Sequence, residues 1–70
     1  MEIILEEILD LVKKKMREQG AYDRDAYGQF IEETIFYFQE RGKLTDDDNE
    51  DFIKKRLVEI YPIVKDEFSV

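Results

Sequence analysis

Two short segments with the same helix-ending chemistry divide this chain into three parts. The first is Gly20-Ala21-Tyr22-Asp23 and the second is Gly42-Lys43-Leu44-Thr45. In each, a glycine suits the left-handed residue that closes a helix, and the final aspartate or threonine suits the cap of the next helix. Connections this short join helices that run antiparallel. The sequence therefore predicts three helices in an up-down-up arrangement.

Apolar spacing predicts these helices at about 2–19, 24–41 and 46–68. The apolar side chains of the first two fill one broad arc, which suits a helix with two neighbours. No stretch shows sustained alternation of apolar and polar residues, so strands are not expected. Pro62 lacks a backbone N–H and clashes with the carbonyl of Val58. We therefore predict an all-α, antiparallel three-helix bundle, one domain over residues 1–70, with its third helix kinked near Pro62.

Two local predictions concern the second helix. Tyr22 and Tyr27 flank its start with the spacing of a hydrophobic staple. Gly28 lowers helix propensity by about 1 kcal/mol relative to alanine. Because Gly28 lies at the margin of the apolar arc, we expect it to permit the close approach of another helix.

The residue types that the chain lacks exclude much of the chemistry of known sites. None of its 70 residues is Cys or His. Thiolate zinc sites, imidazole metal ligands and thiol or imidazole catalysis are therefore excluded. The paired carboxylates Glu6-Glu7 and Glu32-Glu33 are expected on solvated helix faces, where nothing raises the pKa of either carboxyl group. We predict a non-enzymatic protein with no cofactor and no metal site.

The acidic run from Thr45 to Asp51 is the sequence feature that most resembles a cation site, because Ca²⁺ and Mg²⁺ prefer carboxylate oxygens. An EF-hand loop that began at Asp46 would need glycine at its sixth position and glutamate at its twelfth. The chain has Asp51 and Leu57 there. Acidic residues at a helix start also stabilise the helix through its dipole. We therefore interpret Thr45 as a cap and the acids as the first turn of the third helix.

The charge balance disfavours nucleic-acid binding. Eighteen acidic and 11 basic residues give a formal net charge of −7, the wrong sign for a phosphate backbone. The basic clusters at 13–17 and 54–56 follow acidic residues in the same helices, as the helix dipole favours. Two alternatives stay open: a helix-turn-helix-like regulator that uses these clusters, and an acidic inhibitor that mimics nucleic acid through the helix starts.

Aromatic residues crowd the second helix. The four bulky residues of Ile35-Phe36-Tyr37-Phe38 cannot all face one core. Phe36 projects among charged residues, and Phe52 lies off the apolar stripe of the third helix. Exposed aromatic side chains with a charged rim are typical of binding hot spots, although a single exposed Phe36 is also ordinary. We predict that a protein partner or a second copy, as in a homodimer, contacts Phe36, Tyr37, Phe52, Glu33 and Glu40.

The sequence shows no export signal and no membrane span. Glu2 directly follows Met1, and Glu6 interrupts the first apolar run. No window approaches the roughly 18 consecutive apolar residues of a membrane-spanning helix. We therefore expect a cytoplasmic protein without membrane contact.

Overall fold

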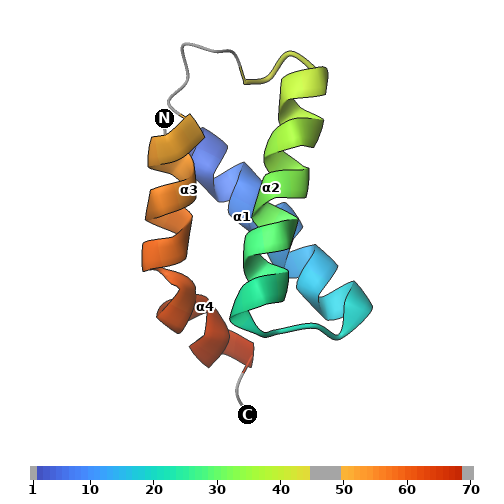
Figure 1. The fold of residues 1–70 in the computed structure, drawn as a ribbon, viewed down its shortest axis with the longest axis vertical. Helices are drawn as coiled ribbons and strands as arrows, with labels where there is room; N and C mark the ends of the chain where they lie inside the picture. Colours follow the sequence, from blue (N-terminus) through green and yellow to red (C-terminus); the bar gives the residue numbers. More distant parts are fainter. Residues whose placement is uncertain (1, 45–49, 69–70) are drawn as a thin grey trace.

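The computed structural model describes residues 2–44 and 50–68, which form four helices and no strand (Figure 1). The helices are α1 (Glu2–Gln19), α2 (Arg24–Glu40), α3 (Glu50–Glu59) and α4 (Tyr61–Phe68). The all-α prediction is confirmed. In Figure 1, α1, α2 and α3 run in alternating directions, and α4 turns beneath the start of α2.

The two predicted glycine segments end α1 and α2. Gly20 and Gly42 have φ values of 62° and 74°, in the left-handed region that glycine adopts without strain. After each glycine, the next N–H donates to a carbonyl in the last turn of the preceding helix, which satisfies a group that the helix leaves unpaired. These hydrogen bonds join Ala21 to Met16 (3.1 Å) and Lys43 to Phe38 (2.9 Å).

The start of α2 is capped as predicted, but its two tyrosines have partners that the sequence did not indicate. Oδ1 of Asp23 accepts a hydrogen bond from the backbone N–H three residues later (2.7 Å). The ring centroid of Tyr22 lies 4.9 Å from that of Phe68. The ring centroid of Tyr27 lies 4.9 Å from that of Tyr61. Both rings therefore pack on α4, a set of contacts that the staple prediction missed.

The predicted third helix is divided in two at Ile60. α3 ends one residue before Ile60 and α4 begins one residue after it, so a break stands where we predicted a kink within one helix. Pro62 is the physical reason, because it offers no N–H to the carbonyl of Val58. The carbonyl of Ile60 accepts hydrogen bonds from Ile63 (3.0 Å) and Val64 (3.1 Å) instead, and these bonds begin α4.

The predicted start of the third helix lies outside the described residues. This applies to the cap Thr45 and to the acids at 46–48, on which the cation-site and nucleic-acid-mimic interpretations depend. Of the acidic run, the structure describes Glu50 and Asp51. α1 and α3 begin at the same end of the molecule (Figure 1).

One apolar core joins the four helices, and α2 contributes the largest share of it. The buried residues recur at one-turn spacing along each helix, which places them on a common side. They are Ile8, Val12 and Met16 of α1; Tyr27, Phe30, Ile31, Ile35 and Phe38 of α2; Leu44; Ile53 and Leu57 of α3; and Val64 of α4.

Gly28 does not mark a close contact between helices of this chain. A Cβ atom added at Gly28 would meet no heavy atom of the described residues within 4 Å. The prediction that another helix of the chain approaches closely here is therefore wrong. Gly28 lies along an open groove between α2 and the C-terminal helices, which Val58 and Tyr61 also line.

Candidate interaction surfaces

Phe36 lies on the outward side of α2, where 60% of the residue is exposed to solvent. The prediction from the sequence that Phe36 faces solvent is therefore confirmed. Tyr37, the next residue, is 46% exposed. Glu33 and Glu40 lie about one turn before and after Phe36, and both are exposed. We call Phe36, Tyr37, Glu33 and Glu40 the α2 aromatic patch.

Neighbouring charged groups hold two members of this patch. The guanidinium carbon of Arg41 lies 4.7 Å from the ring centroid of Tyr37, a cation–π contact at the end of α2. Glu33 accepts a hydrogen bond from Nζ of Lys15 on α1 (3.5 Å) and another from Gln29 (3.4 Å). Tyr37 and Glu33 are therefore oriented by their surroundings, and Phe36 stands between Glu33 and Glu40.

Phe52 belongs to a different surface. It is 44% exposed and lines a groove between α1 and α3, together with Leu5 and Leu9 of α1. Tyr37 lines grooves between α1 and α2. The structure therefore brings Phe36 and Tyr37 together but places Phe52 elsewhere.

The α1–α3 groove has a largely apolar floor and a charged rim. Leu5, Leu9 and Ile60 are half-buried, and Phe52 covers one side. Sequence reasoning missed this groove because it assigned both leucines to the core arc of the first helix. The breadth of that arc was the available signal, since residues at its edge lie where two helices meet. The lining residues are Leu5, Glu6, Leu9, Phe52, Arg56, Leu57, Glu59 and Ile60.

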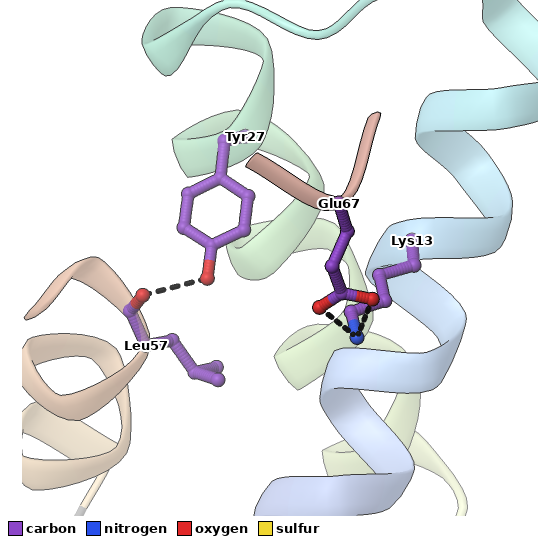
Figure 2. Close-up of polar contacts among 4 residues, drawn as sticks. All are labelled: Lys13, Tyr27, Leu57 and Glu67. Atoms are coloured by element: carbon purple, nitrogen blue, oxygen red, sulfur yellow. Dashed lines mark hydrogen bonds and ion pairs between the residues drawn. The ribbon is translucent and has the colours of Figure 1, made fainter. Parts of the chain in front are cut away.

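Carboxylates accompany the two basic clusters that were candidates for nucleic-acid contact. Such pairing neutralises charge that a phosphate backbone would otherwise attract. Figure 2 shows the best-formed pair, in which Nζ of Lys13 donates to both carboxylate oxygens of Glu67 (3.1 and 2.9 Å). The other pairs are Lys15 with Glu33 (3.5 Å), Lys54 with Glu50 (3.0 Å) and with Glu32 (3.8 Å), and Arg56 with Glu59 (3.6 Å).

Glu50, at the start of α3, has both carboxylate oxygens engaged. Oε2 lies 3.0 Å from Nζ of Lys54, and Oε1 accepts a hydrogen bond from Gln39 (2.6 Å). These hydrogen bonds, that from Lys54 first, lower the pKa of Glu50, and the same bond to Glu50 raises the pKa of Lys54. Both shifts favour the charged forms. Glu50 therefore ties α3 to the end of α2.

Tyr27 is a buried titratable side chain in the core. Its hydroxyl donates a hydrogen bond to the carbonyl of Leu57 (2.6 Å; Figure 2). Burial, and secondly the neighbouring hydroxyl of Tyr61, raises the pKa of Tyr27 to about 12. A hydroxyl held neutral on a backbone carbonyl of α3 fits a structural role.

Within residues 2–44 and 50–68, no helix is both long enough and apolar enough to cross a membrane. No three acidic side chains of these residues gather where they could hold a metal ion. In comparisons with known proteins, no family model, no curated protein and no solved structure matches this chain.

Proposed function

We propose that this protein is a small, non-enzymatic, helical protein–protein interaction module that binds through the α2 aromatic patch. The exposure of Phe36 carries the proposal. This side chain is 60% exposed on the helix that supplies the largest share of the core. Transfer of a phenylalanine from water to an interface contributes on the order of 2 kcal/mol. A partner that covers Phe36 recovers burial that the monomer leaves unused.

The surroundings of Phe36 support an interface of ordinary composition. Binding hot spots combine a central aromatic anchor with a polar rim that excludes water. Glu33 and Glu40 supply that rim, and Arg41 holds the neighbouring ring of Tyr37. In this proposal the protein acts in the cytoplasm without membrane contact, and α3 and α4 together serve as the bent third arm of a three-helix bundle.

A charge placed at the centre of the patch tests the proposal. Phe36→Glu should abolish retention of partner proteins from a lysate of the source organism, because it puts a carboxylate where the interface is dry. Quantitative mass spectrometry of proteins retained by the immobilised full chain measures this effect. Sedimentation velocity over a range of concentrations separates a foreign partner from a second copy, since only self-association depends on the concentration of this chain alone.

Ile63→Glu is the matched control, because Ile63 on α4 is also highly exposed (65%) and apolar. Circular dichroism should show both variants folded. The proposal requires that Ile63→Glu retain the wild-type partners and that Phe36→Glu lose them. Equal retention by the two variants, together with monomeric sedimentation of the wild type, would contradict it.

A further inference from the structure

We infer that the α1–α3 groove binds the apolar face of a basic amphipathic helix from another protein. The groove lies between α1 and α3, and α2 contributes none of its lining residues. This inference therefore identifies a second surface, beyond the α2 aromatic patch, and states the chemistry of its partner.

The floor of the groove has the shape that a helix requires. Leu5 and Leu9 are one turn apart on α1, while Phe52 of α3 and Ile60, directly after the end of α3, are about two turns apart. At a rise of about 1.5 Å per residue, these residues form one apolar ridge about 6 Å long on the α1 side and one about 12 Å long on the α3 side. The groove has a volume of about 760 Å³. A helix of about three turns can place apolar side chains at i, i+3, i+4 and i+7 between the ridges.

Phe52 provides the anchor of this surface. It is 44% exposed beside leucines that are themselves half-buried, so one inserted partner side chain can touch apolar atoms of both helices. Aromatic anchors of this kind dominate the energy of many interfaces. The two ridges also explain why a helix fits better than an extended segment, since a strand presents its apolar side chains at a different period.

The rim determines the charge of the partner. Glu6 on the α1 side and Glu59 on the α3 side are exposed carboxylates. Arg56 is the one basic residue among the described lining residues, and its Nη1 lies 3.6 Å from Oε1 of Glu59. The rim is therefore net negative, which favours lysine or arginine at both flanks of an incoming apolar stripe. A second copy of this chain fits less well, because each copy carries a net charge of −7 and the copies repel.

A designed peptide tests this inference with the full chain. The probe is an amphipathic peptide of about 15 residues, with leucine on one face and lysine on both flanks. The first comparison peptide replaces every lysine by glutamate, and the second keeps the lysine composition in scrambled order. Fluorescence anisotropy should show that the lysine-flanked probe binds at least about tenfold more tightly than either comparison peptide. Amide chemical-shift changes should map to α1 and α3.

Surface substitutions then locate the site. Phe52→Glu should weaken binding of the lysine-flanked probe by at least about tenfold. Glu6→Lys leaves the apolar floor intact and should reduce or reverse the preference for lysine over glutamate flanks. Phe36→Glu, on the α2 aromatic patch, is the matched control and should leave probe binding unchanged. Circular dichroism establishes that each variant keeps its helical content.

Four results would overturn the inference. The first is equal binding of ordered and scrambled lysine peptides, which indicates charge attraction alone. The second is an unchanged affinity of the probe for Phe52→Glu. The third is a set of chemical-shift changes confined to α2. The fourth is a dimer of the wild type that Phe52→Glu dissociates, which assigns the groove to a second copy. Failure of the proposed function would be distinguishable from failure of this inference, because the proposed function is tested by the partner proteins that the wild type and Phe36→Glu retain.

Discussion

At the scale of single residues, Tyr27 connects the centre of the molecule to the end of α3. Its side chain is 1% exposed, and its hydroxyl donates to the carbonyl of Leu57 at 2.6 Å. Leu57 lies in the last turn of α3, where carbonyl groups lack partners within the helix. The hydroxyl of Tyr27 therefore helps α3 to end near Ile60, since it supplies a donor to a carbonyl group close to the break.

Replacing Tyr27 by phenylalanine tests this hydrogen bond. The free energy of unfolding at neutral pH should fall by about 1–2 kcal/mol, because the buried carbonyl of Leu57 loses its tyrosine donor. Urea unfolding followed by circular dichroism measures the loss. Tyr37→Phe is the control, since Tyr37 is 46% exposed, and it should change stability by less than about 0.5 kcal/mol.

The pKa of Tyr27 gives the same variant a pH signature. Its folded-state pKa of about 12 lies above the unfolded value of about 10, so the unfolded chain releases this proton first as the pH rises. The associated stability is fully present below about pH 10 and is lost as the pH rises toward 12, by about 2–3 kcal/mol. The stability advantage of the wild type over Tyr27→Phe should therefore shrink over this range and then change sign, because the loss is larger than the advantage of about 1–2 kcal/mol at neutral pH. A constant difference would contradict the role assigned to burial.

At the scale of helices, the sequence predicts ends better than it predicts breaks. Gly20 and Asp23 act on their own neighbours, so the bounds of α1 and the start of α2 follow from local patterns. Pro62 indicates that the third helix is interrupted. Whether the helix kinks or breaks there depends on which groups donate hydrogen bonds to the nearby carbonyl groups. One of those groups is the hydroxyl of Tyr27, 30 positions away from Leu57.

The two candidate surfaces also differ in how far the sequence predicts them. A projection of α2 alone was sufficient to predict that Phe36 is exposed, because exposure depends on which side of one helix faces the core. The meeting of Phe52 with Leu5 and Leu9 depends on how α3 lies against α1. The breadth of the apolar arc of α1 indicates a second neighbour, but it does not specify which residue of that neighbour meets Leu5 and Leu9, so the lining of the α1–α3 groove could not be predicted from the sequence.

Gly28 offers a prediction at this scale. Gly28→Ala should raise the free energy of unfolding by up to about 1 kcal/mol, because alanine has the higher helix propensity. The added methyl group meets no described atom within 4 Å. Gly42→Ala is the contrasting control. Its φ of 74° should make alanine destabilising by about 1 kcal/mol. Thermal and urea unfolding measure both changes, and a destabilising Gly28→Ala would show that the glycine is needed within the folded chain.

At the scale of the whole molecule, the narrow shape explains why large apolar side chains remain in water. The molecule measures 38 × 21 × 19 Å, so its cross-section is about two helix diameters. Each helix therefore keeps an outward face, and the helices meet along open grooves. Phe36 occupies such a face, and Phe52 occupies such a groove. The small cross-section of the molecule therefore accounts for both candidate surfaces.

The same narrowness makes α4 depend on a few contacts with the rest of the chain. α4 has 8 residues, too few for a stable isolated helix. Val64 enters the core, and the hydroxyl of Tyr61 donates to the carbonyl of Tyr22 (2.9 Å). Near the other end of α4, Glu67 receives both hydrogen bonds from Lys13 (Figure 2). α4 should therefore open locally while α1 and α2 stay packed.

Native-state amide exchange of a Lys13→Met variant tests this dependence. Methionine keeps the apolar stem of Lys13 and removes the ion pair, which is worth up to about 1 kcal/mol at a partly exposed site. Exchange in α4 should therefore accelerate by about two- to fivefold, with α1 and α2 unchanged. Lys15→Met is the matched control, because Lys15 forms its ion pair with Glu33 of α2 instead. Equal acceleration of α4 in both variants would indicate general loosening, and no acceleration in Lys13→Met would mean that Val64 and Tyr61 alone hold α4 in place.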